Sequence, residues 1–271
     1  MVVDRSLLAV GWPGEPAVVV SAWRAGAWHE LGAVGDLDAP RPWASVTKLV
    51  TALAAAIDLH EGRATLEDPV GPTRATLAHL LSHASGLGFE AGDPVIEPGV
   101  KRIYSNFGID LAGAHLATEG DVARWLTSTV LAPLEMTSAR VVGRASEGVV
   151  GSTRDLARLG REWVTPSLLT RESRDASVAV AFPDLSGTVP GFGRFTPCPW
   201  GLGPEVRGPK NHWMGDWPAD SFGHFGRSGA LVLANATLGI VVAATSTVDF
   251  GPWARDAWPA WTSRVRRGAS S

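Results

Sequence analysis

Segments typical of β-strands lie at both ends of this chain, and segments typical of helices fill its middle. Residues 6–33 contain the apolar runs LLAVGW, AVVVSAW and WHELGAV, divided by Gly and Pro and by the turn RAGA. Strand patterns return between residues 221 and 248 as SFGHFGRSGA, LVLANATL and GIVVAATSTV. Short apolar runs separated by turn residues favour antiparallel hairpins. One sheet must therefore be assembled from both ends of the chain, which leaves few possible topologies.

The helical segments lie between these two groups of strands. One helix begins near Ala44, carries apolar residues at helical spacing and ends at Gly62. TLAHLLSHAS, SNFGIDLAGAHLAT, DVARWLTSTVLAPL and TRDLARLGREWV predict further helices, and PWARDAWPAWTSRVRR predicts a terminal one despite its internal proline. Residues 180–220, rich in Gly, Pro, Trp and Phe, predict an irregular loop.

This order of elements predicts an α+β fold. Residues 1–62 and 201–271 would form a sheet lobe flanked by helices, and residues 63–200 would form a mainly helical lobe of the same unit. A cleft between two such lobes is a common place for a small-molecule site.

Composition excludes several classes of partner. With 45% hydrophobic and 19% charged residues the chain can bury a large core, and its net charge of −3 argues against a nucleic-acid partner. Asp4 interrupts the N-terminal apolar stretch, and no long uncharged apolar run follows, so we expect a cytoplasmic protein without a membrane partner. The single cysteine, Cys198, lies in a turn-like stretch and is not expected to act as a nucleophile.

Ser45 and Lys48 form the first candidate catalytic pair. Residues three apart on a helix share a face, so the ammonium can reach the hydroxyl. Lysine is rare here: the chain has only Lys48, Lys101 and Lys210. A lysine can act as a base only if burial lowers its pKa. Taken alone, the pair is equally compatible with a helix-capping serine and a solvated lysine.

Two further motifs follow in the sequence. The only tyrosine, Tyr104, is followed two residues later by Asn106; a phenol can relay a proton and an amide can orient a substrate, although a core aromatic beside a capping asparagine is the alternative. The segment GHFGRSGA places His224 and Gly226 on a predicted strand. Gly226 would let a substrate backbone approach closely.

Ser-x-x-Lys, Tyr-x-Asn and His-x-Gly in this order are similar to the motifs of the class C β-lactamase, DD-peptidase and esterase superfamily of serine hydrolases. ASVTKLVTAL, TLAHLLSHASGL, EPGVKRIYSNFGIDLAGA, LAPLEMTSAR and GVVGSTRDLARL also resemble segments of that family, in family order. The likeness covers roughly residues 40 to 160 and resumes near 221 to 245.

The resemblance implies a role for each motif residue. Ser45 would be the acylated nucleophile, Lys48 its proton acceptor and Tyr104 the second acid/base. Asn106 would orient the substrate and the lysine. The backbone N–H groups of Ser45 and Arg227 would form the oxyanion hole.

The sequence also departs from the family pattern. His224 and Gly226 stand where many relatives have Lys-Thr-Gly, which weakens recognition of the carboxylate of β-lactams and D-Ala-D-Ala peptides. Arg227 is a candidate replacement for that charge. Residues 165 to 220 match no family segment.

The sequence therefore predicts a serine hydrolase that forms an acyl-enzyme on Ser45 and acts on small esters or amides without a cofactor or metal. A β-lactamase or D-alanyl-D-alanine carboxypeptidase is the alternative within the same chemistry, and a catalytically silent ligand-binding scaffold is the alternative of another class. His79 and His83 lie four residues apart on a predicted helix, but no third ligand suggests zinc. Three tryptophans of the irregular loop either line the acyl pocket or pack as ordinary core: Trp200, Trp213 and Trp217.

Overall fold

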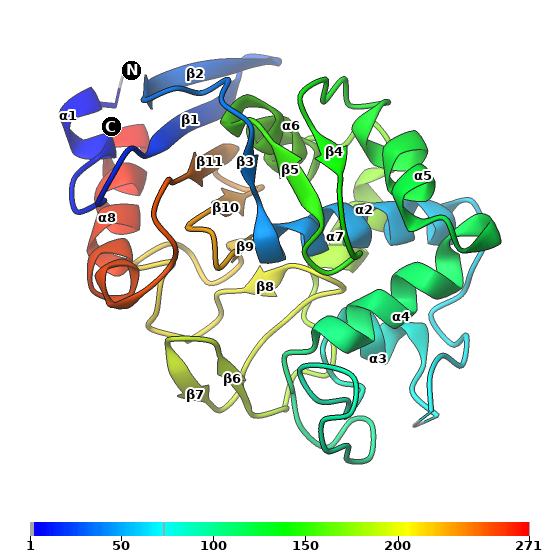
Figure 1. The fold of residues 1–271 in the computed structure, drawn as a ribbon. Coiled ribbons are helices and arrows are strands. Elements are labelled where there is room, and N and C mark those ends of the chain that lie inside the picture. Colours follow the sequence, from blue (N-terminus) through cyan, green and yellow to red (C-terminus); the bar gives the residue numbers. More distant parts are fainter. Residues whose placement is uncertain (1–2, 73, 271) are drawn as a thin grey trace.

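The computed structural model describes residues 3–72 and 74–270 of the chain. Its main element is a six-stranded antiparallel sheet in the order β2-β1-β11-β10-β9-β8, with strands from both ends of the chain, as predicted (Figure 1). The strands are β1 Ala17–Arg24, β2 Ala27–Val34, β8 Glu205–Val206, β9 Phe222–Phe225, β10 Leu231–Asn235 and β11 Ile240–Thr245.

The central strands are buried on both faces. Val18, Val20 and Val242 belong to one hydrophobic core, whereas Val19 and Val241 belong to the other. Successive side chains of a strand point to opposite faces, so this alternation places a core on each side of the sheet.

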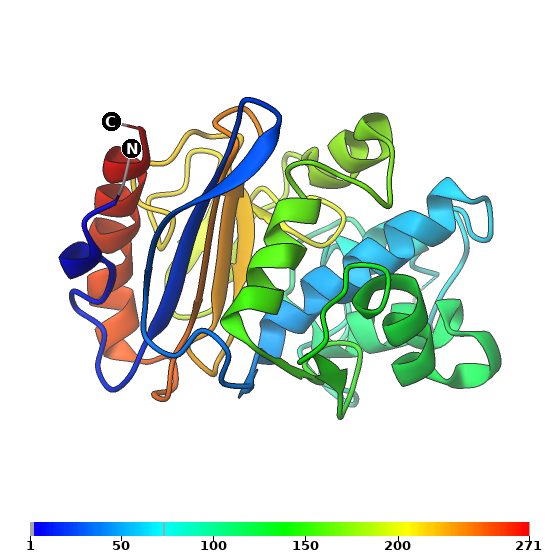
Figure 2. The same cartoon turned by 90° about the horizontal axis from the view of Figure 1, so that it is seen from above.

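Helices cover both faces of the sheet, as Figure 2 shows. The C-terminal helix α8 (Pro252–Ser270) lies on one side. Helices α2 (Thr47–His60) and α6 (Thr153–Glu162) lie on the other side, where α6 packs against β1, β10 and β11. The predicted α+β class is confirmed.

Further helices are α3 Leu77–Leu81, α4 Asn106–Leu116, α5 Val122–Leu126, which continues as a π-helical turn over Thr127–Leu131, and α7 Arg171–Val178. Helices α4, α5 and α7 pack against α2. A small sheet contains β3 Arg41–Pro42, β5 Val149–Gly151 and β4 Arg140–Val141, and a separate hairpin contains β6 Gly187–Val189 and β7 Gly193–Phe195. The division into two lobes at residues 62 and 200 stays a prediction, and α6, from the middle of the chain, lies against the sheet.

Three local predictions were wrong. The first apolar run is not a strand: Arg5–Leu8 form the short helix α1, because the Asp4 side chain accepts a hydrogen bond from Ser6 N at 2.9 Å and starts a helical turn. Residues 180–220 are not wholly irregular, since they contain β6, β7 and the edge strand β8. The helix predicted for TLAHLLSHAS is shorter than that segment and ends at Leu81.

Within the described part of the chain, every helix is too short or too polar to cross a membrane.

Candidate active site

Ser45 lies in a short 3₁₀ turn, Ala44–Val46, that leads directly into α2. The turn is anchored by the buried Trp43, whose Nε1 donates to the carbonyl of Gly151 at 3.0 Å. Ala44 adopts a positive φ of 45°, a backbone conformation that costs energy for a residue with a side chain. A half-buried Ser45 side chain is therefore presented on a rigid and locally strained turn.

Lys48 is completely buried and lies beside Ser45. Its Nζ donates to Ser45 Oγ at 3.2 Å, to Asn106 Oδ1 at 2.6 Å and to the carbonyl of Ser146 at 2.9 Å. It also lies 4.8 Å from the centre of the Tyr104 ring. Three separate segments thus fix the ammonium against the serine hydroxyl.

Burial lowers the pKa of Lys48 to about 7. Loss of water around a charged amine disfavours its protonated form. Arg144 lowers the pKa further, whereas the carboxylates of Asp110, Glu147 and Glu90 raise it and offset part of the effect. A substantial fraction of Lys48 is therefore a neutral amine near pH 7, which is the form that can accept a proton.

Tyr104 completes the cluster around Ser45. Burial raises the pKa of its phenol, and a hydrogen bond with Ser45 acts in the opposite direction. The phenol therefore stays protonated at neutral pH, so it can donate a proton but does not start as a base. Its ring lies 4.6 Å from the ring of His83 and 5.8 Å from that of His224.

Asn106 has partners on both sides of its amide. Oδ1 accepts from Lys48, and Nδ2 donates to Glu90 Oε1 at 2.9 Å. The residue is 2% exposed and begins α4, which Ser105 caps through its hydroxyl. The expected lysine-orienting role fits this geometry, whereas its amide is turned toward protein groups rather than toward the cavity.

Glu90 and Arg144 connect the two loops that hold Lys48. Arg144 contacts Glu90 through both terminal nitrogens, at 2.7 and 3.1 Å, and also pairs with Glu147 at 2.8 Å. Hydrogen bonds from Arg144 and then Asn106 lower the pKa of Glu90 to about 2. Sequence reasoning missed this ion pair, because the residues are 54 positions apart and neither belongs to a recognisable motif.

His224, on β9, is buried and cannot replace a lysine as a cation. Its Nδ1 contacts the carbonyl of Phe225 at 2.7 Å, and its Nε2 has no partner among the described residues. Burial, and then the charge of Lys48, lower the pKa of His224 to about 3, so the ring is neutral.

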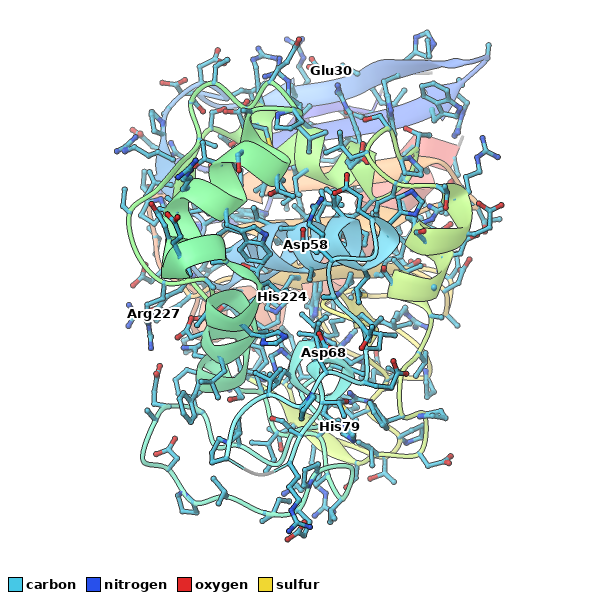
Figure 3. All side chains as sticks on the ribbon, turned by 90° about the vertical axis from the view of Figure 1, so that its right-hand side faces the viewer. Glu30, Asp58, Asp68, His79, His224 and Arg227 are labelled. Carbon is cyan, nitrogen blue, oxygen red and sulfur yellow. The ribbon has the colours of Figure 1, made fainter. Side chains whose placement is uncertain are left out.

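Gly226 follows β9 and approaches the serine turn. A Cβ at this position would lie 2.3 Å from the carbonyl oxygen of Trp43 and 3.2 Å from Ser45 N. Gly226 therefore lies against the protein's own backbone. The sequence had suggested that a substrate backbone would approach it. The next residue, Arg227, is exposed, and Figure 3 shows it at the edge of the molecule.

A cavity of about 210 Å³ opens beside Ser45. Most of its walls are aromatic: it is lined by Ser45, Phe89, Tyr104, Pro190, Trp200, His224, Phe225 and Arg227. Of the three tryptophans from the loop, Trp200 lines the cavity. Trp213 and Trp217 pack in the core under α8 and donate their indole N–H groups to Glu205 Oε2 and the Thr262 carbonyl.

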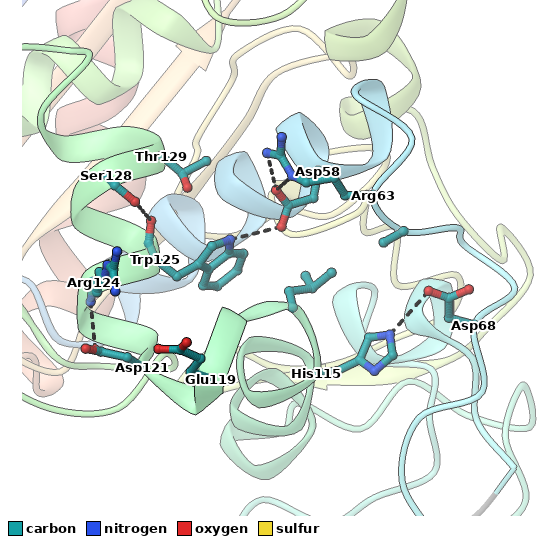
Figure 4. A pocket seen from close by; sticks show the side chains of 12 residues that line it. Asp58, Arg63, Asp68, His115, Glu119, Asp121, Arg124, Trp125, Ser128 and Thr129 are labelled. Carbon is teal, nitrogen blue, oxygen red and sulfur yellow. Dashed lines mark hydrogen bonds and ion pairs between the residues drawn. The ribbon is translucent and has the colours of Figure 1, made fainter.

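A larger cavity of about 690 Å³ lies near the far end of α2, as Figure 4 shows. Asp58, which lines it, is 13 residues after Ser45, roughly 20 Å along a helix. Its carboxylate accepts hydrogen bonds from Arg63 and from Trp125 Nε1, and the carboxylate of Asp68 contacts His115. No residue of the predicted site lines this cavity.

His79, His83 and Cys198, which the sequence set aside, do not line the cavity beside Ser45. His83 has a positive φ of 59° beyond the end of α3, so His79 and His83 do not share a helix, contrary to the sequence interpretation. Among the described residues, no group of three or more His, Cys, Asp or Glu side chains could hold a metal ion. Cys198 is buried, and burial raises the pKa of its thiol.

The chain resembles known proteins over most of its length. The Beta-lactamase family model matches residues 12–263. The chain belongs to the β-lactamase family. A β-lactamase from Mycobacterium bovis is 32% identical in sequence and superposes with a TM-score of 0.92, over 99% of this chain and 100% of the other.

More distant solved structures share the fold. A β-lactamase/D-alanine carboxypeptidase from Yersinia pestis is 19% identical, with a TM-score of 0.76 over 98% of this chain and 95% of the other. EstCE1, described as a hydrolase with promiscuous acyltransferase activity, is 15% identical, with a TM-score of 0.69 over 94% and 93% of the two chains. A search of curated protein sequences gives no match.

Proposed function

We propose that this β-lactamase-family protein is a serine esterase that acts on esters with an apolar acyl group through an acyl-enzyme on Ser45. The observation that carries the proposal is the buried Lys48 amine, 3.2 Å from Ser45 Oγ, with a pKa of about 7. A neutral amine at this distance can take the proton from the hydroxyl as it attacks.

Each chemical step has a group in place. Lys48 accepts the proton of Ser45 Oγ while the Oγ–C bond to the ester carbonyl forms. The backbone N–H groups of Ser45 and Arg227 stabilise the resulting oxyanion. The bond from carbon to the alcohol oxygen then breaks, Tyr104 gives that oxygen a proton, and Lys48 restores the proton to Tyr104. Water cleaves the acyl-enzyme by the reverse sequence of proton transfers, releasing the acid and the Ser45 hydroxyl.

Three observations favour an ester over a β-lactam or a peptide. His224 is neutral, so the third motif offers no cation for a substrate carboxylate. The amide of Asn106 is held by Lys48 and Glu90 and does not line the cavity. The cavity walls are mainly aromatic and suit an apolar acyl group.

One observation supports a second function. Arg227 lines the cavity and carries a charge that could hold a carboxylate, as a β-lactamase or D-alanyl-D-alanine carboxypeptidase requires. The test compares p-nitrophenyl butyrate, nitrocefin and a D-Ala-D-Ala peptide on one preparation, with the Ser45→Ala protein as the blank. Hydrolysis of the ester alone supports the esterase. Faster turnover of nitrocefin or the peptide than of the ester would reject the esterase and support the second function.

The pH dependence of hydrolysis should report the lysine. We expect kcat/KM for p-nitrophenyl butyrate to fall as the pH drops through about 7, because protonated Lys48 cannot accept the Ser45 proton. His224, with a pKa of about 3, stays neutral over this range and adds no second transition. A profile that stays level down to about pH 5 would contradict the assignment of Lys48 as the base.

The Glu90–Arg144 ion pair allows a sharper test of the same base. Glu90 raises the pKa of Lys48 and Arg144 lowers it, so Glu90→Gln should move the acid limb to lower pH and Arg144→Gln should move it to higher pH. Both variants also remove contacts that hold Asn106 in place. A loss of these contacts by itself would lower the rate in both variants, but it would not shift the acid limb in opposite directions. Shifts in the same direction, or none, would count against the proposed base.

A further inference from the structure

A second cavity, of about 240 Å³, shares part of its lining with the cavity beside Ser45. Three residues line both: Phe89, Tyr104 and Pro190. We call the part that contains Ser45 the inner compartment. The outer compartment is the part lined, beyond the shared residues, by Lys101, Arg102, Ile103 and Thr188. Because the two compartments share these three walls, they lie next to each other.

The shared walls are apolar and fixed. The rings of Phe89 and Tyr104 are stacked, with centroids 6.1 Å apart. The Phe89 side chain is 48% exposed, yet its carbonyl accepts hydrogen bonds from Asn106 N at 2.9 Å and Phe107 N at 3.2 Å. An exposed aromatic ring on an anchored backbone is available to contact the hydrocarbon part of a ligand.

Two cations, Lys101 and Arg102, line the outer compartment, and Arg102 is held by hydrogen bonds within the protein. Arg102 is 2% exposed and donates to the carbonyls of Cys198 at 2.6 Å and Ala181 at 2.7 Å, and also to that of Ser82. Lys101 is half-buried and has no ion pair or hydrogen bond with any described residue. No carboxylate lines either compartment. The outer compartment therefore has a positive charge without a counter-ion.

The backbone separates Lys101 from Tyr104 along the chain. Arg102 bridges Gly187, and Arg102 N donates to the carbonyl of Ser186 at 2.9 Å, so the segment before Tyr104 is extended. At about 3.3 Å per residue, the α-carbons of Lys101 and Tyr104 are roughly 10 Å apart.

We propose that the outer compartment is a substrate subsite for a carboxylate at the far end of an elongated apolar ester, with Lys101 as its partner. The proposal rests on the esterase function and narrows its substrate class. The inner compartment takes the ester carbonyl, the apolar middle lies between Phe89 and Pro190, and the carboxylate meets the Lys101 ammonium.

The kinetic test uses esters matched in length and different in charge. On the acyl side, the p-nitrophenyl half-ester of octanedioic acid is compared with p-nitrophenyl octanoate; on the alcohol side, 4-carboxyphenyl butyrate is compared with phenyl butyrate. For the pair whose carboxylate reaches the outer compartment, acyl-side or alcohol-side, Lys101→Glu should raise KM of the carboxylate ester about tenfold, because attraction of the carboxylate becomes repulsion. KM of the matching neutral ester should stay within about twofold. Arg171→Glu on α7, an exposed site with the same change in net charge, is the matched control and should change neither.

Two results would overturn the subsite. One is an equal change of KM for charged and neutral esters in Lys101→Glu, and the other is the same effect in Arg171→Glu. Binding of the octanedioate monomethyl ester to Ser45→Ala, with and without Lys101→Glu, separates this proposal from the esterase function because no turnover is needed. Binding that depends on Lys101 supports the subsite even if ester hydrolysis is absent. If the wild-type protein hydrolyses p-nitrophenyl butyrate but Lys101→Glu changes KM equally for charged and neutral esters, the subsite alone is rejected.

Discussion

Replacing Ser45 with alanine is expected to lower ester hydrolysis by about 10⁴-fold, because acyl transfer then has no nucleophile. The fold should be retained. Lys48 loses one hydrogen bond at 3.2 Å but keeps Asn106 Oδ1 and the Ser146 carbonyl as acceptors. The measurement is kcat/KM for p-nitrophenyl butyrate at pH 8, with circular dichroism to compare the folds.

A fluorophosphonate provides a readout that does not depend on the choice of ester. Ser45 Oγ should displace fluoride and form one phosphonyl adduct per chain, located by mass spectrometry. Ser45→Ala should show no adduct, and Lys48→Met should react far more slowly because the proton acceptor is gone. Cys198→Ala is the control, since that thiol is buried and off the reaction path. An unlabelled but folded wild-type protein would favour the silent scaffold, and full activity in Ser45→Ala would refute the nucleophile.

The parts of the site that the sequence predicted are those set by short-range chemistry. Ser45 and Lys48 are three residues apart, and a helix turn brings such side chains together whatever else the chain does. The same holds for Tyr104 and Asn106, which follow each other into α4. The two-ended sheet was also predictable, because β1, β10 and β11 are runs of buried apolar residues.

The parts that the sequence did not predict depend on contacts between distant segments. Glu90 and Arg144 meet across 54 positions, and this contact turns the amide of Asn106 away from the cavity. The short apolar run after Asp4 is compatible with a helix as well as with a strand, so a single capping hydrogen bond decides its structure. The aromatic cavity combines Phe89, Trp200 and Phe225 from three separate segments, with no shared motif.

Replacing Gly226 with alanine should disable the site by moving the serine turn. The new Cβ would lie 2.3 Å from the Trp43 carbonyl oxygen, closer than real Cβ contacts allow, and 3.1 Å from Ala44 Cβ. Neither side can yield easily. The Trp43 carbonyl accepts from Val46 N at 3.1 Å, and Gly226 N donates to the Ala230 carbonyl at 2.8 Å.

A displacement of about 1 Å at this point would separate the N–H groups of Ser45 and Arg227, which we propose stabilise the oxyanion, from that oxygen. We therefore expect Gly226→Ala to lower kcat by about 10²-fold or more and to reduce the free energy of unfolding by about 1–3 kcal/mol. Gly251→Ala is the matched control, since its nearest neighbour is Trp253 Cδ1 at 3.7 Å, an ordinary contact. If Gly226→Ala keeps wild-type kcat and stability, the close approach of β9 to the turn does not fix the catalytic geometry, and the oxyanion hole must be sought elsewhere.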